Sequence, residues 1–336
     1  MLFRPAIIAL LLASSANVAM VLGVAPYAVD VIRHWDIRSG SERQLSLERR
    51  TYLMSVLLSV VLATQLLALL LFVFNADRMA PLFVGAMCAA GVLNADAYGY
   101  PALMAQIAVF FLAAIWLAIN HVDTLSPDYP LVRVKYGLML GMAPALAAAA
   151  LLQFLYFLNL QADSITSCCS RVFAASAAGL SGDLTALPPR PSMLAFYGTL
   201  AAAVASSAYT ALRRRGGYVV AVTSLAAFAA AITGIISFLS LYIYEHPNHH
   251  CPFCVLKSAY AFQGYWLYIP LFAATACGLS AGAIQPFVQT PSLRGAAPRV
   301  SSRLAGAAAV GFALFTLVAT FLILHSHLIL IAGVTQ

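Results

Sequence analysis

Residues 218–243 read YVVAVTSLAAFAAAITGIISFLSLYI, and this stretch of 26 residues without a charged side chain decides the fold class. About 20 apolar residues in a helix are enough to cross the roughly 30 Å hydrocarbon core of a bilayer. The same composition extends over the chain, since 62% of its 336 residues are hydrophobic and 9% are charged. A soluble domain cannot bury so much apolar surface. We therefore predict an integral membrane protein.

Seven further apolar runs accompany this one, which predicts an all-α, polytopic transmembrane bundle of about eight helices. The runs are continuous and do not alternate with polar residues, which favours helices over a β-barrel. Residues 80–95 are also apolar, but this run is short and suits a re-entrant or interfacial segment. The predicted spans cover residues 6–28, 53–75, 102–121, 136–160, 193–212, 218–243, 261–283 and 304–331.

Basic residues gather on one side of the predicted bundle, where four alternate loops hold 13 of the 18 Lys and Arg residues. The positive-inside rule places these loops in the cytoplasm and both termini outside it, in a bacterial or archaeal cytoplasmic membrane. The basic clusters then account for the net charge of +7 as topology signals that also contact anionic lipid headgroups. The charge requires no nucleic-acid partner. The 13 residues are Arg33, Arg38, Arg43, Arg49, Arg50, Arg133, Lys135, Arg213, Arg214, Arg215, Arg294, Arg299 and Arg303.

Two cysteine pairs fall on the predicted non-cytoplasmic side. Cys251 and Cys254 have the Cys-x-x-Cys spacing that suits thiol–disulfide exchange, and a helix starting at this motif would favour the thiolate through its N-terminal N–H groups. Cys168 and Cys169 are adjacent, which suits either a strained, reducible disulfide or a clamp for a soft metal ion. Ordinary structural disulfides are the alternative for both pairs.

Further metal-ligating residue types lie on the same side. His249 and His250 directly precede Cys251, and Cys88 is the fifth cysteine on this side. Imidazole and thiolate ligands suit copper or zinc ions, so His249, His250 and Cys88 are the ligands of an alternative, metal-binding interpretation. A solvated loop would explain the histidines equally well. Cys277 lies within a predicted span, and we expect it to be a packing residue.

The order of helices and cysteines over residues 136–283 resembles the vitamin K epoxide reductase family and, more loosely, the bacterial quinone-linked disulfide-forming oxidases. The string CPFCVLKSA, which begins at Cys251, is similar to the CPYCLLSA type of bacterial members. The resemblance implies a four-helix redox bundle in which Cys254 lies nearest a bound quinone. Cys251 would exchange with the loop pair Cys168 and Cys169, which would meet a thioredoxin-like partner outside the membrane.

Three aromatic residues near the motif, Phe253, Tyr260 and Trp266, would wall the quinone pocket that the resemblance implies. An interfacial aromatic belt is the alternative explanation for each of them. The chain departs from the family in the adjacency of Cys168 and Cys169 and in its extra helices, which keeps metal handling open.

We therefore hypothesise a membrane thiol–disulfide oxidoreductase coupled to quinone. The alternatives are a soft-metal protein that binds or transports copper or mercury, and a structural subunit of a respiratory complex. The predicted organisation is three N-terminal helices with a basic loop (1–135), the redox-like bundle (136–283), and a cytoplasmic linker with the last helix (284–336).

Overall fold

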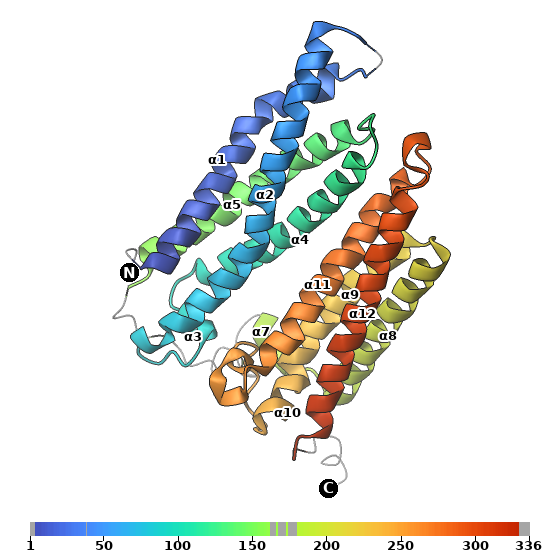
Figure 1. Cartoon of the computed structure of the whole chain (residues 1–336). Helices are drawn as coiled ribbons and strands as arrows, with labels where there is room; N and C mark the ends of the chain where they lie inside the picture. Colours follow the sequence, from blue (N-terminus) through green and yellow to red (C-terminus); the bar gives the residue numbers. More distant parts are fainter. Residues whose placement is uncertain (1–3, 38, 162–165, 167–172, 174–179, 329–336) are drawn as a thin grey trace. The chain divides into compact units, whose positions relative to one another are not determined.

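The computed structural model describes residues 4–37, 39–161, 166, 173 and 180–328. Within these residues the regular elements are helices and there is no β-strand, so the predicted all-α class is confirmed. Seven helical stretches are long and apolar enough to cross a membrane, and the chain is an integral membrane protein (Figure 1). They are α1 (Pro5–His34), α2 (Glu42–Met79), α4 (Gly99–Thr124), α5 (Val132–Asn159), α9 (Gly217–Gly234) with its continuation to Tyr244, α11 (Gln263–Ile284) and α12 (Ala297–Leu324).

The predicted span at 193–212 coincides with α8 (Pro189–Arg213), which is not among these seven. Its serine, threonine and tyrosine side chains lower its hydropathy, although the helix is long enough to cross. At least one of these polar groups serves helix packing, because the hydroxyls of Ser206 and Thr223 are 2.7 Å apart and join α8 to α9. Serine and threonine commonly bond neighbouring helices in this way within membranes.

Residues 80–95, the predicted re-entrant segment, form two short helices joined by a loop. The first is η1 (Ala80–Leu82) and the second is α3 (Ala89–Leu93). At about 1.5 Å rise per residue, neither can cross a bilayer. A third short helix, α7 (Leu180–Thr185), precedes α8.

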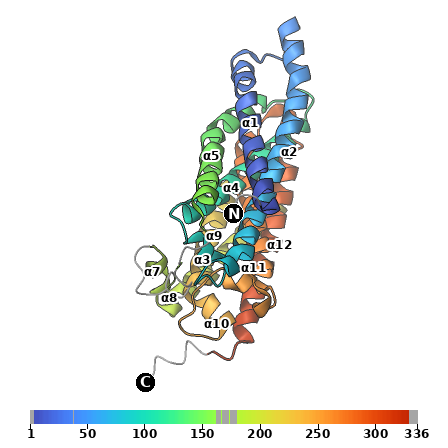
Figure 2. The same cartoon turned by 90° about the vertical axis from the view of Figure 1, so that its left-hand side faces the viewer.

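The chain divides into two compact units, each built around its own set of long helices. Unit 1 contains α1, most of α2, α4 and α5, and in it α5 packs along α1 and α4 (Figure 2). Unit 2 contains α3, α8, α9, α11 and α12. This grouping differs from the predicted segments, because α5 groups with the N-terminal helices and α12 with α8, α9 and α11. Unit 1 comprises residues 1–75, 96–161 and 283–301, and unit 2 comprises 76–95, 162–282 and 302–336.

A chain of buried amide side chains connects the four helices of unit 1. Asn17 Nδ2 donates to Gln65 Oε1 at 2.6 Å, and Gln65 Nε2 donates to Gln106 Oε1 at 2.6 Å. Gln106 Nε2 donates to Gln153 Oε1 at 2.7 Å, and Gln153 Nε2 donates to Ser14 Oγ at 3.1 Å. Each bond satisfies a polar group that would have no hydrogen-bond partner in the hydrocarbon of the bilayer. The glutamines therefore serve helix–helix association.

A buried ion pair corrects one part of the charge analysis. Lys135, predicted to be a loop cation, is fully buried in α5, where its Nζ lies 2.7 Å from Asp123 Oδ2 of α4 and 3.1 Å from Asn120 Oδ1. Asp123 also accepts the Leu131 N–H at 2.7 Å. Burial of an ion requires such compensation, because desolvation of an unpaired charge is costly. Lys135 thus holds the α4–α5 connection together and is not exposed to lipid headgroups.

A second carboxylate joins two cytoplasmically predicted loops of unit 1. Asp128 accepts hydrogen bonds from the hydroxyls of Ser126 and Ser292. Burial raises the pKa of this carboxyl, but the two hydroxyl donors outweigh burial and hold the pKa below its ordinary value. The contact connects the turn after α4 to η6 (Pro291–Leu293).

Glycines allow the helices of unit 2 to pack closely. A Cβ at Gly278 of α11 would come within 2.0 Å of Ser224 Oγ on α9, and one at Gly282 within 2.4 Å of Ala221 Cβ. These two glycines are four residues apart and lie on one face of α11, the spacing that brings membrane helices together. Gly311 of α12 likewise faces Ala274 of α11. The helices α9, α11 and α12 therefore pack closely within unit 2.

Candidate thiol site

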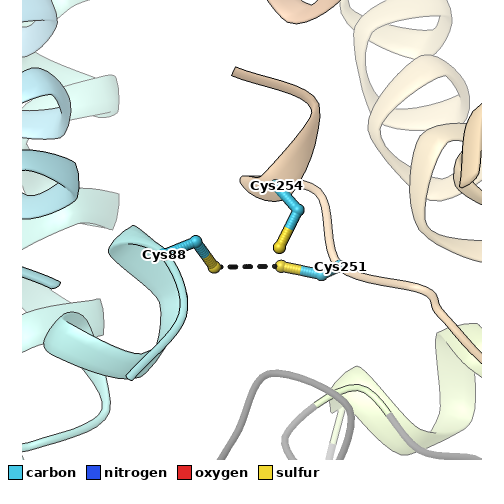
Figure 3. A group of neighbouring side chains, drawn as sticks. All are labelled: Cys88, Cys251 and Cys254. Carbon is cyan, nitrogen blue, oxygen red and sulfur yellow. Dashed lines mark hydrogen bonds between the residues drawn. The ribbon is translucent and has the colours of Figure 1, made fainter. Parts of the chain in front are cut away.

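Three cysteines of unit 2 converge, from segments distant in the sequence. Cys88 Sγ lies 3.4 Å from Cys251 Sγ, and the sulfurs of Cys88, Cys251 and Cys254 all lie within 4.8 Å of one another. Figure 3 shows the three side chains pointing toward one another, with Cys88 on the α3 segment and the other two on the loop before α11. A disulfide bond is about 2.05 Å long, so the two nearest sulfurs are in contact and are not bonded. Cys88 and Cys251 are 0% exposed, and Cys254 is 5% exposed.

Cys88 stands immediately before α3 and closes the loop from η1. Its carbonyl accepts the Gly91 N–H at 3.1 Å. Close packing requires glycine at position 91, because a Cβ there would come within 2.8 Å of Ala86 Cα. The short loop and the tight first turn of α3 therefore fix where the Cys88 sulfur points.

Two tyrosine hydroxyls hold the backbone of the Cys-x-x-Cys loop. Tyr244 OH donates to Cys251 O at 2.5 Å, and Tyr268 OH donates to Pro252 O at 2.7 Å. Tyr244 lies on the helix formed by α9 and α10, and Tyr268 lies on α11, so these two helices position the loop. Bonds of this kind to loop carbonyls limit the backbone movement of Cys251 while leaving its sulfur on the Cys88 side.

A π-helical turn accepts a third hydrogen bond from the same loop. The helix formed by α9 and α10 (Ser240–Tyr244) is interrupted by the π-helix η2 (Ile235–Leu239). His250 Nδ1 lies 2.9 Å from Ile236 O within this turn, and Nδ1–H is the donor because a carbonyl can only accept. Single π-turns leave backbone groups available and recur at functional sites. This hydrogen bond fixes the position of His250, the residue before Cys251.

Cys254 does not stand at the start of a long helix, which corrects the sequence-based expectation. It opens the short η3 (Cys254–Leu256), which is followed by η4 (Ser258–Tyr260). Ala261 and Phe262 then adopt left-handed backbone conformations, with φ of 50° and 56°, and α11 begins only at Gln263. The chain reversal at these two residues separates the motif from α11. The N-terminal N–H groups of α11 are therefore nine residues beyond Cys254 in sequence.

An ion pair joins the two segments that carry the sulfurs. Lys257 Nζ lies 3.4 Å from Asp77 Oδ1, and both side chains are about one quarter exposed, at 28% and 24%. The same Asp77 oxygen accepts the Ala89 N–H at 3.3 Å, next to Cys88. Lys257 is three residues beyond Cys254, and its N–H donates to Cys254 O at 3.0 Å. The pair thus connects the backbone around Cys88 to the backbone around Cys254.

Of the three predicted cofactor-binding aromatics, one lines a groove between long helices of unit 2. Trp266 is 66% exposed and lines an apolar groove between α11 and α12, whereas Phe253 and Tyr260 are not among the lining residues. The Tyr260 ring packs against the ring of Tyr244, with centroids 4.5 Å apart and the ring planes inclined by 58°. Phe253 is half-buried within the motif itself.

The residues of the metal-binding interpretation are also separated. His249 stacks on the ring of Tyr244 at 4.3 Å between centroids, and His250 bonds to Ile236 O. Among the described residues, the sulfur group within 4.8 Å contains no histidine. Only Cys88 of the three predicted ligands joins it. Cys277 packs in the core of unit 2, as expected.

Cys168 and Cys169 lie outside the described residues. Thr166, two positions earlier, is described, and its N–H donates to Val84 O at 3.0 Å. Its hydroxyl donates to Gly91 O at 2.7 Å.

Sequence reasoning missed Asp77 and its ion pair with Lys257, and it did not pair Cys88 with the motif. The only signal was that Cys88 falls on the same predicted side, since 163 positions separate it from Cys251. Chemically, three adjoining thiols can exchange a disulfide or bind a thiophilic ion. Comparisons with protein-family models, curated proteins and solved structures find no match to this chain.

Proposed function

We propose that unit 2 is a membrane thiol–disulfide oxidoreductase in which Cys251 is the sulfur shared by two alternative disulfides. The observation that carries the proposal is the 3.4 Å contact between Cys88 and Cys251, with Cys254 in the same group. Closing this distance to a bond of about 2.05 Å requires a movement of about 1.4 Å, which is within the reach of side-chain rotation.

Three sulfurs are sufficient for one exchange step. The thiolate of Cys88 attacks the Cys251 sulfur of a Cys251–Cys254 disulfide, so that a Cys88–Cys251 bond forms and the Cys251–Cys254 bond breaks. The Cys254 thiolate leaves and takes up a proton. Two sulfurs are oxidised before and after the step, so the disulfide moves without net oxidation.

Formation of the first disulfide requires an electron acceptor. Two thiols lose two electrons and two protons when they join, and a membrane quinone takes up two of each on reduction to the quinol. Quinone is proposed as this acceptor because the buried sulfurs are out of reach of a soluble protein, while a lipid-soluble carrier approaches through the bilayer.

An apolar groove between α11 and α12 supports the proposal of a lipid-soluble carrier. Its volume is about 630 Å³, and side chains such as Trp266 and Phe321 line it, with Gln263 as a polar group at the start of α11. Pockets of this size accommodate small ligands. Gly264 in the same turn of α11 packs against Leu256, within the turn that Cys254 opens. The groove therefore begins on the turn of α11 that packs on η3.

The partner and the sidedness are further parts of the proposal. A thioredoxin-like protein outside the membrane would receive the disulfide through Cys168 and Cys169, since the three buried sulfurs are not open to a protein. The non-cytoplasmic placement is supported by the positions of Arg213–Arg215 and Cys251, which flank opposite ends of the α9–α10 helix.

Single-cysteine variants test the shared-sulfur proposal. Reduced protein in lipid nanodiscs would be mixed with a short-chain quinone under anaerobic conditions, quenched with an alkylating agent, and mapped by mass spectrometry. We expect Cys254→Ser to retain only the Cys88–Cys251 disulfide, Cys88→Ser only Cys251–Cys254, and Cys251→Ser neither. Cys277→Ser is the matched control and should behave as the unmodified chain. Equal disulfide yield at Cys88 in Cys251→Ser and the unmodified chain would overturn the proposal.

A further inference from the structure

We infer that the fully reduced form of the same three cysteines is a binding site for one Cu(I) ion, held by three thiolate sulfurs. This inference goes beyond the proposed redox function and does not depend on it, because it concerns protein in which no disulfide is present. The observation behind it is the mutual proximity of Cys88, Cys251 and Cys254, in a group of three buried sulfurs supplied by two loops.

The sulfur separations fit a metal–thiolate centre. A metal–thiolate bond is about 2.3 Å long, so three sulfurs around one ion in a plane are about 4.0 Å apart. The shortest separation, 3.4 Å between Cys88 and Cys251, lies below this value, and the upper limit of 4.8 Å for the group lies above it. Small side-chain rotations therefore suffice to place all three sulfurs at bonding distance.

The donor set selects for a soft ion. Within the described part of the chain, the group contains cysteines only, with no carboxylate or imidazole atom at ligand distance. Thiolates favour Cu(I), whereas Mg²⁺ and Ca²⁺ require oxygen ligands. Zinc usually takes a fourth protein ligand, and among the described residues no histidine or carboxylate joins the group of three sulfurs. We therefore expect Cu(I) to be preferred over Zn²⁺.

Binding is an exchange of protons for the metal ion and involves no redox change. Three thiols release three protons to solvent, three Cu–S bonds form, and copper remains Cu(I). The tyrosine bonds to the carbonyls of Cys251 and Pro252 hold the loop in place, so little backbone ordering opposes binding.

The test is a Cu(I) titration of the full chain in lipid nanodiscs, reduced beforehand and kept anaerobic, with bicinchoninate as the competing chelator. We expect one equivalent of Cu(I) per chain, three sulfur neighbours in the X-ray absorption spectrum, and an affinity for Cys88→Ser lower by about 100-fold or more. Cys277→Ser should bind as tightly as the unmodified chain. The double variant Cys168→Ser/Cys169→Ser should also retain binding, because the sulfurs of Cys88, Cys251 and Cys254 suffice for the proposed three-coordinate site.

Two results would overturn the inference. The first is less than a tenth of an equivalent bound, and the second is binding that survives Cys88→Ser but is lost in the Cys168/Cys169 double variant. Disulfide mapping of quinone-treated protein is a separate readout, so the two proposals fail independently. Cu(I) binding without any quinone-dependent disulfide would refute the redox function alone. A quinone-dependent disulfide without Cu(I) binding would refute the copper site alone.

Discussion

Lys257→Met should shift the balance between the two disulfides that we propose for the thiol site. Lys257 Nζ and Asp77 Oδ1, 3.4 Å apart, join the Cys254 turn to the segment that carries Cys88. Ion pairs near a protein surface contribute about 0.2–1 kcal/mol, and this pair is about three-quarters buried, which places it near the upper value of about 1 kcal/mol. Because RT is about 0.59 kcal/mol, loss of the pair should lower the ratio of Cys88–Cys251 to Cys251–Cys254 disulfide by up to about fivefold.

The ratio can be measured after equilibration in a glutathione redox buffer, acid quenching, alkylation and quantitative mass spectrometry of the linked peptides. Asp77→Asn should cause a similar decrease, since it removes the opposite charge while keeping an oxygen for the Ala89 N–H. Lys257→Arg is the matched control and should preserve the ratio within about twofold, and high salt should narrow the differences between variants. An unchanged ratio in both Lys257→Met and Asp77→Asn would refute the connecting role of the pair. An equal decrease in Lys257→Arg would show that charge is not the cause.

Three further predictions concern packing and charge. Gly278→Leu should destabilise unit 2 by several kcal/mol, because its side chain would collide with Ser224 at the α9–α11 contact, and the thermal midpoint in detergent would report it. Lys135→Met should cost about 3–5 kcal/mol by leaving Asp123 buried without its cation, whereas adding Asp123→Leu should restore most of that stability in the same denaturation assay. Asp128 has a lowered pKa in the folded chain, so its contribution to stability is present above the unfolded pKa and is lost as pH falls through the folded pKa. Asp128→Asn should therefore flatten the acid limb of the stability curve, and an unaltered limb would contradict this assignment.

The membrane fold could be predicted from the sequence because hydropathy is a local property. A run such as 218–243 must be helical in lipid whatever its neighbours are, and the helix from Gly217 to Tyr244 confirms this. The grouping of helices into units could not be predicted, since it depends on contacts such as Gln106 with Gln153 between helices. Lys135 was misassigned for the same reason: its loop position resembles that of a topology cation, and only the tertiary contact with Asp123 shows that it is buried.

Part of the thiol site could also be predicted. The Cys251–Cys254 spacing identifies the motif, and the predicted sidedness puts Cys88 in the same region. The contact with Cys88 could not be derived, because no spacing rule connects residues 163 positions apart. The expected helix start at the motif was wrong because Ala261 and Phe262 adopt left-handed conformations that a sequence pattern does not reveal for non-glycine residues.

The pairing partner of Cys88 in native membranes tests the shared role of Cys251 most directly. Membranes would be treated with an alkylating agent before solubilisation, so that existing disulfides are preserved, and the linked peptides would be identified by mass spectrometry. The thiol-relay account predicts a Cys88–Cys251 peptide in the unmodified chain and its enrichment in Cys254→Ser. Cys88 found fully alkylated in both chains, with Cys251 never linked to it, would contradict the account.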